Sequence, residues 1–147
     1  MSKGKTSDLF VLYTLDDEVH GINVTDVISI ERIMPMTRVP NAQYFVQGVI
    51  NLRGEIIPVI NLKKRFGMQQ TEHNDENRII IAIVNDFQVG IMVDSVLEIT
   101  NVEKDRIQRA TEVVSGEYGD LIDGITEHNG SIVYFPDYPT VLGLNNI

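Results

Sequence analysis

The sequence predicts an all-β protein built as two similar small barrels, and three observations lead to that prediction. Many short apolar segments are separated by glycine and proline, which is typical of β-strands joined by tight turns. The order of glycines, valines and helix caps in the first half of the chain returns in the second half. Each copy holds too few strands for a sandwich, which favours small closed barrels.

The clearest elements lie in the middle of the first copy. Apolar segments at Phe45–Ile50 and Ile56–Ile60 predict two strands, joined by a tight turn at Leu52–Gly54. A short helix is expected to begin at Asn61, whose side chain is a good N-cap. Gly67 suits the left-handed end of that helix.

The flanking segments are also expected to be extended. Strands are predicted at Leu9–Leu15 and Val19–Val24, and Pro35 and Pro40 fix an extended connector after them. Residues 68–77 are polar and show no periodicity, so they are expected to form a linker.

The segment after the linker repeats the one before it. Gly21 aligned with Gly90, an offset of 90 − 21 = 69 residues, also pairs the triad Val24, Val27 and Ile30 with Val93, Val96 and Ile99. Gly48 aligned with Gly124, an offset of 124 − 48 = 76, pairs Gly54 with Gly130, Asn61 with Asp137 and Gly67 with Gly143. The additional 76 − 69 = 7 residues fall before Asp120, where residues 103–119 are expected to form a polar loop or a marginal helix.

This repeat predicts the domain organisation. We expect a single domain over 1–147, with a first barrel half at 8–67, a linker at 68–77 and a second half at 78–147. The two barrels are expected to be related by an approximate twofold axis.

Composition and charge limit the classes of partner and the cellular location that we expect for this chain. The net charge is 12 − 21 = −9, so a nucleic-acid partner is disfavoured because phosphate would be repelled. The chain has no cysteine, no signal peptide and no run of about eighteen apolar residues. We therefore expect a soluble, cytoplasmic protein.

No catalytic constellation is evident in the sequence. His20, His73 and His128 show no metal-ligand spacing, and the glycines and serines match no phosphate-binding or nucleophile motif. We therefore expect no enzyme activity, no cofactor and no metal.

The repeat marks Arg53 as unusual. The second hairpin tip is His128-Asn129-Gly130, where Asn-Gly is a strong turn signal, whereas the first has Leu52-Arg53-Gly54. Turn chemistry does not explain an arginine at this position. Either Arg53 is an ordinary solvated side chain, or its guanidinium is a site for a carboxylate.

The same stretch carries a family resemblance. G-V-I-N-L-R-G followed by I-I-P-V-I-N-L-x-x-R-F-G resembles the signature of CheW, the coupling protein of bacterial chemotaxis, and weaker similarity runs from about Phe10 to Gly143. The resemblance implies two SH3-like, five-stranded barrels and a non-catalytic adaptor. Its implied partners are the CheW-like regulatory domain of the histidine kinase CheA and the cytoplasmic tips of chemoreceptors, so membranes would be reached only indirectly.

The resemblance also implies a kinase- and receptor-binding surface. Arg53 matches a functional arginine of the motif, and Glu31 is a possible ion-pair partner for it. The remaining implied residues are Val24, Val27, Ile30, Gly48, Asn51 and Gly54. Val24, Val27 and Ile30 are expected either near a receptor-binding groove between the barrels or in plain core. The alternative functions are a small β-barrel enzyme or ligand-binding protein, and an SH3-like nucleic-acid binder.

Overall fold

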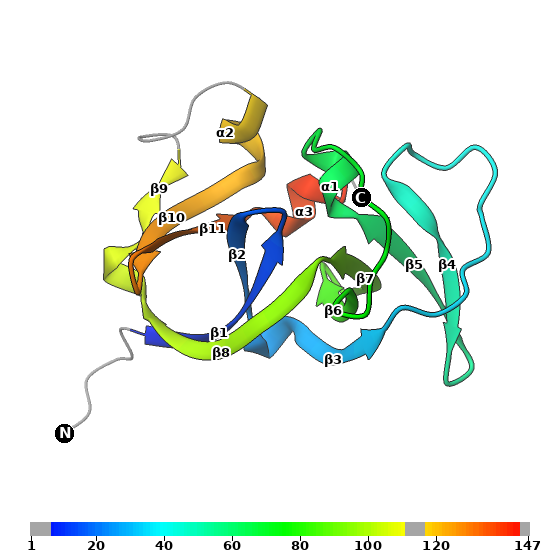
Figure 1. Ribbon diagram of the computed structural model, residues 1–147, viewed down its shortest axis with the longest axis horizontal. Coiled ribbons are helices and arrows are strands. Elements are labelled where there is room, and N and C mark those ends of the chain that lie inside the picture. The colour runs from blue at the N-terminus through cyan, green and yellow to red at the C-terminus, as the bar shows by residue number, and fades with distance from the viewer. Residues whose placement is uncertain (1–6, 111–116, 145–147) are drawn as a thin grey trace. The chain divides into compact units, whose positions relative to one another are not determined.

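The computed structural model describes residues 7–110 and 117–144, and it divides into two compact units. The first unit comprises the chain up to Thr25 and from Leu97 onward, and the second comprises Asp26–Val96. Each unit is built around one β-sheet with a few very short helices (Figure 1).

The first unit holds a six-stranded sheet in the order β8-β1-β2-β11-β10-β9, which curls on itself in Figure 1. Its strands are β1 (Ser7–Leu15), β2 (Glu18–Asn23), β8 (Ser95–Glu103, which begins in the second unit), β9 (Gln108–Arg109), β10 (Ile122–His128) and β11 (Ser131–Pro136). Its short helices are η2 (Lys104–Arg106), α2 (Glu117–Leu121) and α3 (Tyr138–Val141), and η1 (Val24–Asp26) lies at the junction with the second unit.

The second unit holds a five-stranded sheet in the order β3-β6-β7-β5-β4. Its elements are β3 (Val27–Arg32), β4 (Val46–Leu52), β5 (Glu55–Asn61), α1 (Leu62–Arg65), β6 (Arg78–Val84) and β7 (Phe87–Val93). Residues 68–77 lie between α1 and β6 and contain no helix or strand, as expected of a linker.

The predicted duplication is confirmed in the backbone. Shifted by 76 residues, β4 and α1 fall on β10 and α3 with the same bounds. Both helices are capped by the predicted side chain: Asn61 Oδ1 accepts from the Lys64 amide at 3.0 Å, and Asp137 Oδ1 accepts from the Thr140 amide at 3.3 Å. Such recurring local geometry follows from recurring turn and cap residues.

The two compact units differ from the sequence halves 8–67 and 78–147, because the copies exchange hairpins. The β1–β2 hairpin of the first copy pairs through β2 with β11 of the second copy, in parallel. The β6–β7 hairpin of the second copy pairs through β7 with β5 of the first copy, also in parallel. Each sheet therefore needs strands from both halves of the sequence.

Two glycines permit these parallel pairings. A Cβ on Gly21 would lie 2.9 Å from Phe135 Cε1 in the parallel partner β11. A Cβ on Gly90 would lie 3.2 Å from Val59 Cγ2 in the parallel partner β5, and 2.8 Å from Ile79 Cγ2 in the antiparallel partner β6. Gly21 and Gly90 are the pair that defines the first repeat offset. The recurring glycine therefore marks the place in each copy where a side chain from a neighbouring strand fills the space of the missing Cβ.

Each unit has its own apolar core, built from alternate residues of its strands. Buried clusters are centred on Leu12, Val102, Val133 and Phe135 in the first unit, and on Ile50, Ile57, Val59, Ile79, Ile81 and Met92 in the second.

Pro58 lies in β5, which is between β4 and β7 in the sheet. Pairing with β7 begins at Val59, so this partner requires no amide from Pro58. Residues 103–119 contain η2, β9 and the start of α2, while 111–116 lie outside the described residues. In the described ranges 7–110 and 117–144, no helix is long and apolar enough to span a membrane.

Candidate functional site

Arg53 sits at the tip of the β4–β5 hairpin in a left-handed conformation. Its φ is 52° and that of Gly54 is 87°, the pattern of a tight hairpin turn with positive φ at both central residues. The Asn51 side chain supports the turn by accepting from the Gly54 amide at 3.1 Å. Glycine adopts this conformation freely, whereas an L-residue such as arginine is disfavoured in it by about 1–2 kcal/mol.

Glu31 lies close to this hairpin tip. Its Oε2 is 3.7 Å from Arg53 Nη1, so the predicted pair is present as an ion pair but is longer than a direct hydrogen bond. The Arg53 side chain is 72% exposed and that of Glu31 19%. An ion pair of this exposure contributes at most about 1 kcal/mol, because water screens it.

Gly48 leaves space for the connector that packs against the hairpin. A Cβ at this position would lie 2.7 Å from the Thr37 carbonyl oxygen. Thr37 and Val49 exchange two backbone hydrogen bonds of 2.9 and 2.8 Å, which attach the proline-containing connector to the edge of β4. A side chain at Gly48 would therefore displace the connector.

The three apolar candidates are neither core nor fully exposed. Val24 in η1 and Val27 in β3 are half-buried, and Ile30 is exposed. Val27 lies opposite Ala82 and Ile30 opposite Ile80, on a strand at the edge of its sheet. Val24 belongs to the first unit, whereas Val27 and Ile30 belong to the second.

The structure therefore brings some of the predicted residues together. Arg53, Glu31, Asn51 and Gly54 meet at the hairpin tip, while Gly48 lies farther along β4. Ile30 alternates with Glu31 along β3, so the two side chains point to opposite faces of the sheet.

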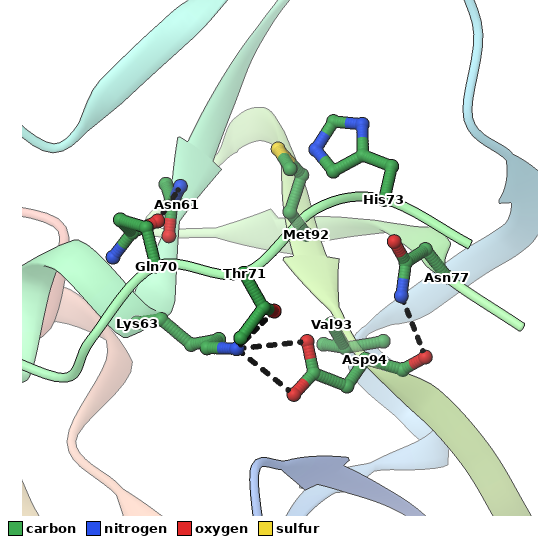
Figure 2. A pocket seen from close by; sticks show the side chains of 9 residues that line it. All are labelled: Asn61, Lys63, Gln70, Thr71, His73, Asn77, Met92, Val93 and Asp94. Atoms are coloured by element: carbon green, nitrogen blue, oxygen red, sulfur yellow. Dashed lines mark hydrogen bonds and ion pairs between the residues drawn. The ribbon is translucent and has the colours of Figure 1, made fainter.

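A second polar cluster was not predicted as a site (Figure 2). Lys63 in α1 is buried, and its Nζ lies 2.9 Å from Thr71 Oγ1 and 3.3 Å from Asp94 Oδ2. Its ammonium is buried beside a carboxylate, which makes it a structural charge, since an unpaired buried ammonium would be unfavourable.

The linker is held by the same cluster. Asn61 donates to Gln70 Oε1 at 2.9 Å, and Asn77 donates to the Asp94 carbonyl at 3.0 Å (Figure 2). The cavity among these residues measures about 30 Å³, room for about one water molecule. The cluster thus fastens residues 68–77 to α1 and β7, which no local sequence signal indicates.

Tyr13 is a fully buried titratable group of the first unit. Burial raises the pKa of its phenol well above the usual range, and the hydrogen bond with Tyr138 opposes that rise. Because the Tyr138 hydroxyl donates to the Gly21 carbonyl at 2.8 Å, the Tyr13 hydroxyl donates to Tyr138, also at 2.8 Å. This chain ties β1 and β2 to α3.

Within the described residues, no group of three or more His, Asp or Glu side chains is placed to hold a metal ion.

Comparison with protein families identifies a match over nearly the whole chain. The model of the CheW-like domain matches residues 9–145. The Bacillus subtilis chemotaxis protein CheW is 35% identical over 138 residues, covering 94% of this chain and 88% of the relative. The corresponding proteins of Treponema pallidum and Thermotoga maritima are 31% and 30% identical, covering 86% and 88% of this chain and 77% and 84% of the relatives.

A solved structure shows the same fold. The crystal structure of the scaffolding protein TtCheW from Thermoanaerobacter tengcongensis superposes with a TM-score of 0.86 at 28% identity, covering 95% of each chain. With a family model and several curated relatives matching most of its length, this chain belongs to the CheW-like domain family.

Proposed function

We propose that this protein is a non-catalytic adaptor of chemotaxis, which couples chemoreceptors to the histidine kinase CheA. Relatives of similar length are named chemotaxis protein CheW, and the similar solved structure is titled a scaffolding protein. In this proposal the protein acts in the cytoplasm, where the kinase and the receptor tips lie.

The proposed mechanism is binding without chemistry. The adaptor contacts the CheW-like regulatory domain of CheA and the cytoplasmic tip of a receptor, and its contacts differ between the active and inactive states of the kinase. Such differential contacts shift the kinase equilibrium by a coupling free energy, typically about 1–3 kcal/mol.

Arg53 carries the proposal. It occupies a backbone conformation that disfavours arginine, it is 72% exposed, and its internal partner lies 3.7 Å away rather than at hydrogen-bond distance. A cation presented in this way is available to a carboxylate on a partner, with which a guanidinium pairs bidentately.

The other candidates have supporting roles in this proposal. Asn51, Gly54 and Gly48 shape the hairpin, and Glu31 orients Arg53. Val24, Val27 and Ile30 supply partly exposed apolar area for the receptor.

The test is reconstitution of the adaptor with CheA and receptor fragments, comparing the wild type with Arg53→Ala. If Arg53 pairs with a partner carboxylate, its loss weakens assembly by a few kcal/mol, because the partner's charge is left unpaired. Kinase activation falls in parallel, while the melting temperature stays within a few degrees.

Asn129→Ala is the matched control, because Asn129 occupies the same turn position in the second copy. It should leave assembly intact. Normal assembly and activation by Arg53→Ala would show Arg53 to be a solvated side chain, and a wild-type adaptor without effect on CheA would refute the coupling function itself.

A further inference from the structure

The hydroxyl group of Ser29 is an unexplained feature of the second unit. Ser29 lies in β3, and its Oγ is shielded from solvent without a hydrogen-bond partner among the described residues. A buried hydroxyl without a partner is unfavourable, and such groups are rare in native proteins. A hydroxyl can rotate about its Cβ–Oγ bond, so it can donate to any acceptor that comes within reach.

Glu31 offers a carboxylate acceptor on the same strand as Ser29. Ser29 and Glu31 are two residues apart on one strand, opposite Ile81 and Ile79 respectively. Residues two apart on a strand point to the same face, and both partner residues belong to the buried cluster of this unit. The Glu31 side chain is 19% exposed, so its carboxylate lies at the rim of that cluster.

The second copy supports this placement. With the repeat offset of 69, Ser29 corresponds to Glu98 in β8. The Oε2 of Glu98 lies 3.9 Å from Nε2 of His128, which is at the tip of the β10–β11 hairpin. A side chain at this strand position therefore faces a hairpin tip in the second copy, and the equivalent tip in the first copy carries Arg53.

A partner carboxylate that forms an ion pair with Arg53 would leave Glu31 without its counter-ion. The present pair is loose, at 3.7 Å, and the guanidinium is largely in solvent, whereas the carboxylate is not. A partly buried carboxylate that loses its counter-ion needs another donor.

We propose that Ser29 is a positioning residue for the Arg53 site, whose hydroxyl donates to the Glu31 carboxylate when Arg53 turns to a partner carboxylate. The inference rests on the proposed function, because it requires that Arg53 binds a partner. In the free protein the Ser29 hydroxyl has no hydrogen-bond partner among the described residues. In the complex it stabilises the released carboxylate and so lowers the cost of moving Arg53.

The first test uses the isolated protein and a mutant cycle of Ser29→Ala and Arg53→Ala. With Arg53 present, Ser29→Ala should leave the melting temperature unchanged or raise it slightly. On the Arg53→Ala background, the same substitution should lower it by about 3 °C, because Glu31 then depends on the hydroxyl. Ser29→Thr keeps the hydroxyl and should restore the higher temperature.

The control adds Glu31→Gln, which removes the charged acceptor and should abolish the coupling between Ser29 and Arg53. An equal effect of Ser29→Ala on both backgrounds, or coupling that survives Glu31→Gln, would overturn the proposal. A packing role for Ser29 gives the equal effect, because packing does not depend on Arg53.

The second test measures binding to the CheA regulatory domain. Ser29→Ala should weaken binding about threefold to tenfold, and it should have no effect on the Arg53→Ala background. Ser29→Ala could instead bind the CheA domain as tightly as the wild type while the melting temperatures still show coupling. That outcome would restrict the role of Ser29 to the free protein and overturn its role in partner binding. If the Arg53→Ala variant binds the CheA domain normally, the proposal that Arg53 binds a partner carboxylate is wrong. The melting temperatures of the mutant cycle then still test whether Ser29 donates a hydrogen bond to Glu31.

Discussion

Arg53 and Asn129 adopt the same φ of 52° at the tips of the two duplicated hairpins. The glycines that follow them are also alike, with φ of 87° at Gly54 and 82° at Gly130. Both hairpin tips therefore require a residue in the left-handed conformation, which asparagine adopts at a lower energetic cost than arginine. The duplication provides an internal reference for the energetic cost of Arg53.

The first prediction exchanges the two residues. Asn129→Arg should lower the free energy of unfolding by about 1 kcal/mol, because it places a poor residue in the left-handed turn. Arg53→Asn should be at least as stable as the wild type, since a better turn offsets the loss of a screened ion pair. Urea denaturation measures both changes; a clear loss of stability by Arg53→Asn would mean that Arg53 supports the fold.

The second prediction concerns the close approach of Gly21 and Phe135. Gly21→Ala should cost about 1–3 kcal/mol of stability, because the new Cβ would lie 2.9 Å from the Phe135 ring. Phe135→Val, which copies the residue found at the equivalent position 59, should relieve the clash. The double variant should therefore lose less than the sum of the single losses, and simple additivity would show that the contact does not limit packing.

A third prediction separates the partners of the buried ion pair. Asp94→Asn should cost about 3 kcal/mol, because it leaves the ammonium of Lys63 in a position where only 8% of its side chain is exposed. Lys63→Met should cost less, since the Asp94 side chain is 28% exposed and keeps access to water. Chemical denaturation measures the loss of unfolding free energy in each variant. Equal losses would show that the different exposure of the Lys63 and Asp94 side chains does not affect the cost of removing either partner.

Val27 gives a fourth prediction. It is half-buried on the edge strand β3, so Val27→Glu should weaken binding of a receptor fragment by tenfold or more at a stability loss of about 1–2 kcal/mol. Val27→Thr is the control of similar shape. A stability loss of about 2–5 kcal/mol with binding retained in the folded fraction would identify Val27 as core.

A fifth prediction follows from the raised pKa of Tyr13. The phenol ionises near pH 10 in the unfolded chain but only at higher pH in the folded protein, so its contribution to stability is complete below about pH 10 and is lost as the pH rises further. Tyr13→Phe should therefore flatten the decline in unfolding free energy as the pH rises above about 10. The same decline in both proteins would assign it to other groups.

What the sequence predicted well was local. Turns, caps and glycines recur because each is specified by a few neighbouring residues, and for this reason Asn61, Asp137 and the two hairpin tips were placed correctly. The pairing of Glu31 with Arg53 could be proposed only as one possibility, because it joins elements that are distant in sequence.

What the sequence did not reveal depends on contacts between distant strands. Parallel pairing of β2 with β11 and of β5 with β7 leaves no signature in either strand alone, so the exchange of hairpins was not foreseen. The burial of Lys63 could not be predicted for a similar reason: its partner Asp94 lies 31 residues away, and a lysine in a basic run resembles an ordinary surface charge.

The exchanged hairpins also set an order for biosynthesis. Translation delivers the second unit as one continuous segment, Asp26–Val96, whereas β1 and β2 leave the ribosome first and must wait for strands near the end of the chain. Strand β11 emerges after both of its neighbours, β2 and β10, and is inserted between them. A premature stop before Ser131 would thus leave β2 with an unpaired edge, the kind of exposed strand that invites aggregation and proteolysis.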